Sequence, residues 1–377
     1  MYITEKYWFQ LNLNFKFECY PNKLQQNQLA NIFGQSRFIW NYFLNKEIET
    51  YKSTNKFNFF NQNSADLTKL KKELIWLNEA PSTTLQQTLK NLEKAMKASF
   101  KKEKGFPKFK SKRQPIKSIN IQMINSNHLD MDFSTIKLPK LGNLKCKFHR
   151  SFPTNFKSCT IKYENFKYFI IFHCTKEAIT NNKLDINKSI GIDLNSKTFV
   201  LSNEIEISIP KFLKESQNQI VRYSRKMSQA CKNSSRFNLY KRKLSKIHLH
   251  VKNQRKDFYH KLSLQIVKDY DFICLEDLSV KDFIGHLKKD SYFYEFRKMI
   301  EYKCELYGKK CFVIDKYFPS TKKCSNCGNV KSKILLSERI YKCDCCNLEM
   351  SRDLNAAINI RTAGMAGIAQ QQKLVAA

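Results

Sequence analysis

The sequence predicts an α/β chain of several domains, in which segments of strands alternate with segments of helices. At 377 residues, the chain is longer than most single domains and long enough for two or three. Apolar residues alternate with polar residues in some segments, whereas in others they recur at steps of three and four residues. Two Cys-x-x-Cys units near the carboxyl end have the spacing of a four-cysteine zinc module.

The amino-terminal segment is expected to form a strand followed by helices. Residues 7–19, YWFQLNLNFKFEC, alternate large apolar with polar side chains, which is typical of a half-buried strand, and Pro21 ends it. From residue 23 to 51, apolar residues fall mostly at three- and four-residue steps, which predicts helix. Gly34 interrupts this pattern, so we expect two consecutive helices.

A further helix is expected from Thr83 to about Lys102. Thr83 and Gln86 have the spacing of a capping box, in which each side chain bonds the backbone of the other residue. An apolar stripe follows, made of Leu85, Leu89, Leu92, Met96 and Phe100. Residues 21–105 are therefore expected to be helical.

The next segment returns to strands after a basic loop. Residues 105–118, GFPKFKSKRQPIKS, contain glycine and prolines that stop a helix, and they include five lysines and arginines. Alternation resumes through residues 119–174. Within it, IKLPKLGNLKCKF and SCTIKYENFKYFIIFHC are typical of hairpins of a small sheet or barrel. We expect the early strand to belong to the same domain, which the helices would interrupt.

The carboxyl-terminal half is predicted to alternate strands and helices. Residues 190–202 form a strand, turn and strand, and the apolar run at 269–280 predicts a buried strand. A helix is expected around residues 293–307, followed by the strand KKCFVID. The last helix starts near Asp353, and the Ala- and Gln-rich tail after Gly364 is expected to be frayed.

The charge of the chain indicates a polyanionic partner. The 67 lysines and arginines against 33 acidic residues give a formal net charge of +34, far more than solubility requires. Nucleic acid is the first candidate, and an anionic membrane surface is the alternative. The sequence has no apolar run of about 18 residues, and its basic residues are interspersed with Tyr, Phe and Asn. We therefore expect a nucleic-acid-binding protein with no membrane partner.

Residues 211–262 concentrate this charge on a helical pattern. They contain fifteen lysines and arginines against two acids, Glu215 and Asp257, whereas a merely solvated helical face would show mixed signs. Phe38, Trp40 and Tyr42 are candidates for stacking on bases, although Phe38 and Trp40 also fit an apolar core stripe. The candidate nucleic-acid contacts are Lys108, Lys110, Lys112, Arg113, Arg222, Arg225, Lys241, Arg242, Lys243, Arg255 and Arg352.

The cysteines indicate a reducing compartment. Their number, 13, is odd, and the residues after Met1, YITEKYWFQLN, lack the apolar core of a signal peptide. We therefore expect the protein in the cytosol. Five cysteines in apolar or alternating segments are expected to be small buried hydrophobic residues: Cys146, Cys159, Cys174, Cys274 and Cys311.

Four other cysteines are candidate zinc ligands. Cys324 and Cys327 form the first unit and Cys343 and Cys346 the second, with 15 residues between them. Cys345 is an additional thiol in the second unit and the alternative ligand there. A zinc ion bound here would limit where the following helix can begin. The alternative is a free-standing zinc ribbon that has no bearing on chemistry.

Three acidic residues lie at the edges of apolar elements: Asp193, Glu276 and Asp353. If they converge, they repel one another unless a divalent cation neutralises them, and Mg²⁺ prefers carboxylate oxygens and water. Such a site holding two ions can activate water and stabilise the leaving oxygen of a phosphodiester. Each acid also has a structural interpretation, as a helix cap, a turn with Asn195, or a polar strand end. Together with the basic chain, the three acids indicate a nuclease.

The order of motifs GIDLNSKTF, ICLEDLSVKDF, FPSTKKCSNCG and YKCDCCNLEMSRDLNAAINI resembles the RuvC-like half of TnpB proteins. These are the OrfB products of bacterial insertion sequences, related to compact type V CRISPR effectors. The resemblance extends to YPNKLQQNQLANIFGQSRFIWNYFL, GFPKFKSKR and NQRKDFYHKLS, and so reaches about Gly364. Asn195 replaces a frequent glycine, and Ser351 replaces the first acid of a frequent Asp-Arg-Asp triplet, but no motif acid is lost.

The resemblance implies a domain organisation. A β-barrel wedge domain interrupted by a helical recognition domain would precede a ribonuclease-H-like (RuvC) nuclease domain with an inserted zinc-binding module. The wedge domain is expected at residues 1–20 and 106–185, and the recognition domain at 21–105. The nuclease domain is expected at 186–318 and 350–364, with the zinc-binding module at 319–349. Residues 365–377 are expected to form a disordered tail.

The resemblance also implies an activity, that of an RNA-guided DNA endonuclease in the prokaryotic cytosol or nucleoid. A guide RNA from the end of the element would select double-stranded DNA beside a short flanking motif. Cleavage would use Mg²⁺ held by Asp193, Glu276 and Asp353, and one structural Zn²⁺ would bind the four cysteines. The alternatives are a non-cutting accessory or regulator of transposition, which retention of all three acids disfavours, and a transposase that breaks and rejoins DNA.

Overall fold

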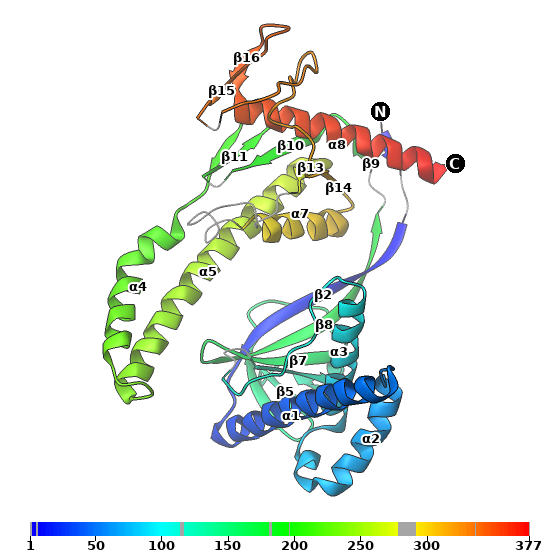
Figure 1. Cartoon of the computed structure of the whole chain (residues 1–377), viewed down its shortest axis with the longest axis vertical. Helices are drawn as coiled ribbons and strands as arrows, with labels where there is room; N and C mark the ends of the chain where they lie inside the picture. Colours follow the sequence, from blue (N-terminus) through cyan, green and yellow to red (C-terminus); the bar gives the residue numbers. More distant parts are fainter. Residues whose placement is uncertain are drawn as a thin grey trace. The chain divides into compact units, whose positions relative to one another are not determined.

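The computed structural model describes residues 2–4, 7–113, 117–180, 183–195, 197–277, 292–335 and 337–376 (Figure 1). The chain divides into two compact units. The smaller unit is Asn12–Lys176, and the larger unit combines Met1–Leu11 with Glu177–Ala377. None of the helices in these described ranges has the length and apolar character needed to cross a membrane.

A seven-stranded sheet forms the base of the smaller unit. Its strands are β2 (Tyr7–Cys19), β3 (Lys117–Gln122), β4 (Leu129–Asp130), β5 (Thr135–Leu138), β6 (Gly142–Lys147), β7 (Phe156–Glu164) and β8 (Lys167–Thr180). The order β3-β7-β8-β2-β6-β5-β4 places the amino-terminal strand inside the sheet, as predicted. The two expected hairpins are the antiparallel pairs β5–β6 and β7–β8. Among the described residues, the outer strands β3 and β4 do not pair, so the sheet does not close into the expected barrel.

Helices pack on this sheet. They are α1 (Lys23–Thr54), α2 (Phe60–Glu73), α3 (Ser82–Phe100) and the short 3-10 helices η1 (Ile75–Glu79) and η2 (Ser126–His128). α1 and α3 contact each other and β3. Their apolar residues share one core with the strands, in which Leu29, Phe43, Leu85 and Phe172 are all buried.

The predicted break at Gly34 is wrong, because α1 is a single helix. Ile32, Phe33 and Ile39, on either side of the glycine, are all buried in the core. This packing outweighs the cost of a glycine inside a helix, which is about 1 kcal/mol relative to alanine.

The capping box predicted for α3 is also wrong. The helix begins after Pro81, and no side chain caps it. The carbonyl of Pro81 instead accepts the Thr84 N–H at 2.9 Å. A capping box is found at the start of α1, where the Asn22 N–H donates to Gln25 Oε1 at 3.0 Å and the Gln25 N–H donates to Asn22 Oδ1 at 2.8 Å.

The larger unit contains a five-stranded sheet with the order β12-β11-β10-β13-β14. These strands are β10 (Ser189–Leu194), β11 (Thr198–Leu201), β12 (Glu206–Ser208), β13 (Phe272–Glu276) and β14 (Lys310–Ile314). β10, β13 and β14 are parallel, whereas β10, β11 and β12 are antiparallel. Two short antiparallel pairs complete the unit, β1 (Tyr2–Thr4) with β9 (Lys183–Asp185) and β15 (Ile340–Lys342) with β16 (Glu349–Ser351).

Helices cover both faces of this sheet (Figure 1). They are α4 (Phe212–Gln229), α5 (Ser235–Asp269), α7 (Phe293–Tyr307) and α8 (Arg352–Ala376). Ile192 and Leu275 face one side, where they share a core with apolar residues of α5 and α7. Side chains alternate along a strand, so Gly191 and Cys274 face the other side, which α8 covers. A Cβ atom on Gly191 would lie only 2.1 Å from the carbonyl oxygen of Ala357 on α8.

The expectation of a disordered tail after residue 364 is wrong, because α8 continues to Ala376. Ile368 is buried together with Leu184 and Phe272. Gly364 and Gly367 allow the helix to approach the sheet, since a Cβ on Gly367 would lie 2.2 Å from the Phe312 ring. Apolar packing on the sheet therefore orders a segment whose composition alone indicates fraying.

Candidate active site and cysteine cluster

The three predicted acids gather at one end of the sheet of the larger unit. In the parallel pair β10–β13, Ile192 lies opposite Leu275, and Asp193 and Glu276 are the next residues of the two strands. They follow Gly191 and Cys274 by two residues, so they face the same side as those residues, under α8. Asp353 lies in the first turn of α8. The fold thus brings together side chains that are up to 160 residues apart in the sequence.

These acids occupy a partly desolvated site of like charge. Asp193 is 6% exposed, and burial, reinforced by the nearby carboxylates of Asp353 and Glu276, raises its pKa to about 7. Burial likewise raises the pKa of Glu276 to about 6. The carboxylate oxygens of the three acids do not all approach within 4.8 Å, in contrast to the cysteine sulfurs described below. A divalent cation would relieve the repulsion, so the donor set fits Mg²⁺.

Neighbouring polar groups orient the acids. Asn195 Nδ2 donates a hydrogen bond to Asp193 Oδ2 at 2.9 Å, and Ser320 Oγ donates to Glu276 Oε1 at 3.4 Å. The guanidinium of Arg352 lies 3.5 Å from Asp353 Oδ1. Arg352, predicted as a nucleic-acid contact, therefore lies beside the acids. The sequence links Asn195 to Asp193 only as a possible structural turn, and it indicates no role for Ser320, because nothing in the spacing of Ser320 points to Glu276.

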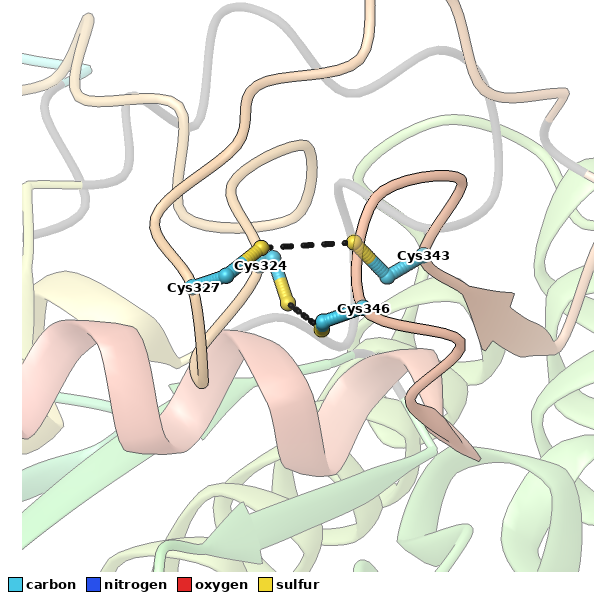
Figure 2. Close-up of side chains that lie close together, drawn as sticks. All are labelled: Cys324, Cys327, Cys343 and Cys346. Atoms are coloured by element: carbon cyan, nitrogen blue, oxygen red, sulfur yellow. Dashed lines mark hydrogen bonds between the residues drawn. The ribbon is translucent and has the colours of Figure 1, made fainter.

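The four predicted zinc ligands converge in the module that precedes α8 (Figure 2). The sulfur atoms of Cys324, Cys327, Cys343 and Cys346 all lie within 4.8 Å of one another. Cys324 Sγ is 3.6 Å from Cys346 Sγ, and Cys327 Sγ is 3.5 Å from Cys343 Sγ. Cys345 is exposed and lies outside the cluster, although its N–H approaches Cys343 Sγ at 3.4 Å.

Backbone hydrogen bonds favour the thiolate form of two of these cysteines, Cys346 and Cys343, whereas the pKa of Cys327 is raised to about 12 by desolvation and by the neighbouring sulfurs. The N–H of Leu348, together with the Asn326 side chain, lowers the pKa of Cys346 to about 6. The N–H groups of Cys346 and Cys345 lower the pKa of Cys343. Thiolates are the form of cysteine that binds Zn²⁺, and four of them in this spacing suit its tetrahedral preference. The residues present thus fit a structural zinc ion.

The predicted basic segment at 211–262 forms a helical hairpin in the larger unit, in which α4 and α5 lie side by side (Figure 1). No residue of α4 is buried, and Val251 is the first buried residue of α5. Arg222, Arg225, Lys241, Arg242 and Lys243 are exposed, and Arg255 is partly exposed. Tyrosines lie among these cations, with Lys243 Nζ at 5.5 Å from the centre of the Tyr223 ring. The arrangement combines positive charge and aromatic rings, as nucleic-acid-binding surfaces do.

The second basic segment lies beside a cleft in the smaller unit. Trp40 Nε1 donates to the Lys108 carbonyl at 3.1 Å, and Lys110 Nζ lies 3.5 Å from the centre of the Trp40 ring. Burial lowers the pKa of Lys110 to about 8. Trp40 is 8% exposed, so its interpretation as a core residue is confirmed, whereas Tyr42 is 41% exposed. Lys112 and Arg113 are exposed in the same loop.

The cleft itself was not predicted from the sequence. It lies among α1, α3, β3 and the basic loop, and its lining includes Arg37, Gln87, Asn91 and Asn120. Its residues come from segments that are up to 87 positions apart, so no local motif reports them.

Three family descriptions match parts of the chain. The helix-turn-helix domain of OrfB proteins matches residues 11–56, the OrfB family described as "Probable transposase" matches residues 172–285, and the "Cas12f1-like, TNB domain" matches residues 293–360.

Relatives match over nearly the whole length. A putative RNA-guided DNA endonuclease of Streptomyces pristinaespiralis is 30% identical over 371 residues, which cover 96% of this chain and 91% of the relative. The putative RNA-guided DNA endonuclease InsQ of Escherichia coli K12 is 28% identical, with 94% and 93% of the two chains covered. The solved complex of Cas12f1 with sgRNA and target DNA has a similar fold, with a TM-score of 0.58, 14% identity, and 93% and 99% of the two chains covered.

Proposed function

The chain belongs to the TnpB (OrfB) family, and from this membership we propose that it is an RNA-guided DNA endonuclease encoded by a transposable element. The observation that carries this proposal is the convergence of Asp193, Glu276 and Asp353 at one end of the five-stranded sheet. A basic protein with a carboxylate site of this kind is suited to hydrolysing a phosphodiester.

We assign the larger unit to a ribonuclease-H-like (RuvC) nuclease domain. Its sheet has antiparallel strands on one side of β10 and parallel strands on the other, and its acids come from β10, β13 and the start of α8. Bound Mg²⁺ ions would supply an activated water and stabilise the leaving oxygen. Asp193, Glu276 and Asp353 would hold these ions, and Asn195 and Ser320 would orient two of the carboxylates.

The four clustered cysteines would hold one structural zinc ion. All four positions of a tetrahedral site would be filled by protein sulfur, which leaves no open position for chemistry. The zinc module therefore serves to fix the segments on either side of it, including the start of α8.

Two surfaces would contact nucleic acid. The α4–α5 hairpin and the loop around Lys110 would bind phosphates of the guide RNA and of the double-stranded target. In guided nucleases base pairing selects the sequence, and the protein reads a short flanking motif. We assign recognition of the flanking motif to the smaller unit. Its cleft offers the amide side chains of Gln87, Asn91 and Asn120, and amides form hydrogen bonds well with the edge of adenine.

Within the smaller unit, the sheet would serve as the wedge domain and residues 21–105 as the recognition domain. DNA cleavage would take place in the prokaryotic cytosol or nucleoid. Both the domain assignments and this location rest on the family resemblance.

The experiment that tests the function starts from the purified full-length chain expressed with flanking DNA of its own element. Sequencing the RNA that copurifies should yield one dominant species that ends in a variable guide. With that guide replaced, the complex should cut a matching plasmid beside one motif selected from a randomised flank. Absence of a defined RNA, or cutting that does not follow the guide, would contradict the proposal.

The family description "Probable transposase" supports one other function, the breaking and rejoining of DNA. The same acids could serve either reaction, so the two functions are distinguished by their DNA products. A nuclease leaves 3′-hydroxyl and 5′-phosphate ends that stay free, whereas a transposase joins an end to a second DNA. Joined products from the purified chain would replace the proposed function by transposition.

A further inference from the structure

Two buried asparagines on α8 have no role in the function proposed above. Asn355 and Asn359 are four residues apart, so their side chains project from the same face of the helix. Asn355 is 0% exposed and Asn359 is 4% exposed. Burying an amide is costly unless its polar atoms are hydrogen-bonded, so the partners show what these side chains hold.

Asn355 binds the backbone on both sides of a cysteine. Its Nδ2 donates to the carbonyl of Lys323 at 2.7 Å, and its Oδ1 accepts the N–H of Ser325 at 2.9 Å. The residue between them is Cys324, the most buried cysteine of the cluster, at 1% exposed. The amide therefore fixes the backbone that presents this ligand.

Asn359 binds the same segment closer to the acids. Its Nδ2 donates to the carbonyl oxygens of Ser320 and Lys323 at 2.8 and 2.6 Å. Ser320 is 4% exposed, and its hydroxyl donates to Glu276 at 3.4 Å. One side chain thus connects α8 to the residue that orients a predicted catalytic acid.

The segment 320–325 therefore touches both groups of predicted metal ligands. Its first residue contacts Glu276, and its fifth residue is Cys324. The asparagines attach this segment to α8, which begins at Arg352 and carries Asp353 in its first turn, two residues before Asn355.

We propose that Asn355 and Asn359 are positioning residues that couple the cysteine cluster to the carboxylate site. Metal at the cysteines fixes segment 320–325, and the two amides hold α8 and Ser320 against it. Coupling of this kind is reciprocal, so a divalent cation at the carboxylates stabilises the zinc-bound module in turn. The inference rests on the proposed function, because it uses the metals assigned there.

The test measures each metal directly in the full chain. Zinc release to a chromophoric chelator is followed with and without Mg²⁺, and the affinity for Mn²⁺, a spectroscopic substitute for Mg²⁺, is measured by electron paramagnetic resonance. In the wild type, saturating Mg²⁺ should slow zinc release at least about fivefold.

Two variants remove the coupling by different routes. Asn359→Asp keeps the size of the side chain but places a carboxylate against the two carbonyl oxygens that Asn359 binds. Ser320→Ala removes only the hydroxyl that donates to Glu276. In both, Mg²⁺ should no longer slow zinc release, and Mn²⁺ affinity should fall about tenfold, as for other residues that support metal ligands. Ser320→Thr retains the hydroxyl and should retain the coupling. Thr362→Ala is the control on α8, because the Thr362 hydroxyl bonds only within the helix.

The possible outcomes separate this inference from the proposed function. A folded Asn359→Asp or Ser320→Ala chain in which Mg²⁺ still slows zinc release would overturn the coupling. If Asn359→Asp does not fold, Ser320→Ala decides. A wild type that binds both metals without any effect of Mg²⁺ on zinc release would overturn the coupling alone. A wild type that binds neither metal would overturn the metal assignments together with it.

Discussion

Lys303 on α7 is a cation buried against α5. It is 5% exposed, and its Nζ donates to the carbonyl of His260 at 2.6 Å and to the Ser263 hydroxyl. Burial lowers its pKa to about 8. Two hydrogen bonds to α5 only partly replace the hydration that the ammonium loses.

This lysine should make stability rise in alkaline solution. Between pH 8 and the ordinary lysine pKa of about 10.4, the unfolded chain binds a proton that the folded chain has released, so the free energy of unfolding increases with pH. Relative to Lys303→Met, the wild type should gain roughly 1 to 3 kcal/mol across this window and nothing below it. Chemical denaturation at a series of pH values measures the difference, and a difference that does not change with pH would refute the assignment.

Single residues were predictable where the chemistry leaves a pattern. The cysteines could be recognised by their spacing, and the acids by their position at the ends of apolar segments. Ser320, Asn355 and Asn359 could not, because their amides and hydroxyl bind groups that only the fold brings near. A polar residue in a helix or loop looks the same in sequence whether it faces solvent or a distant carbonyl.

At the scale of elements, close contact between α8 and the sheet determines where Asp353 lies. A Cβ on Gly191 would lie 2.1 Å from the Ala357 carbonyl oxygen and 2.5 Å from the Arg361 nitrogen, and both are backbone atoms that cannot rotate away. The glycine therefore sets the distance between the helix and the strand that carries Asp193.

Gly191→Ala should displace α8 and lower both stability and cleavage. Overpacking of this kind costs about 1 to 3 kcal/mol, which thermal unfolding measures. Gly34→Ala in α1 is the matched control, because the nearest atom to its Cβ is a flexible arginine nitrogen at 3.9 Å. That change should stabilise the chain by about 0.5 to 1 kcal/mol with activity unchanged. Equal effects of the two substitutions would contradict this account of α8.

The zinc module should depend on four cysteines and not on the fifth. Elemental analysis should find one zinc per wild-type chain, because its four sulfurs fill a tetrahedral site. Cys324→Ser should lose the metal and the order of the module, whereas Cys345→Ser should keep both. Zinc loss from Cys345→Ser together with retention in Cys343→Ser would show that the ligands were assigned wrongly.

The α4–α5 hairpin should account for part of the salt dependence of RNA binding. Replacing Lys241, Arg242 and Lys243 by glutamine removes three exposed charges and should lower the slope of log affinity against log salt by up to about 2. The wild type and the variant should converge at high salt, which serves as an internal control. An unchanged slope would place the RNA elsewhere.

Helices and strands were predictable from periodicity, but their limits depended on tertiary packing. The strands of both sheets and the helix Phe293–Tyr307 follow the apolar pattern. Gly34 does not break α1, and α8 continues past Gly364, because both helices pack apolar residues on either side of these glycines. Local propensity is worth about 1 kcal/mol at such positions, and burial of a large side chain exceeds it.

For the whole molecule, composition and fold point to the same function by independent routes. A net charge of +34 indicates a polyanionic partner but does not say which reaction the protein carries out on it. The carboxylate site suggests hydrolysis but does not select a substrate. Family membership connects the two, since relatives that match from end to end are named as putative RNA-guided DNA endonucleases.

The central claim is that Asp193, Glu276 and Asp353 act together on DNA with Mg²⁺, and guided cleavage by isosteric variants tests it most directly. The variants Asp193→Asn, Glu276→Gln and Asp353→Asn should each bind guide RNA as the wild type does. Their rate of target DNA cleavage should be at most about one thousandth of the wild-type rate. Asp277→Asn is the control, because this neighbouring acid pairs with Arg297 and is 53% exposed. Undiminished Mg²⁺-dependent cutting by the three variants would contradict the account.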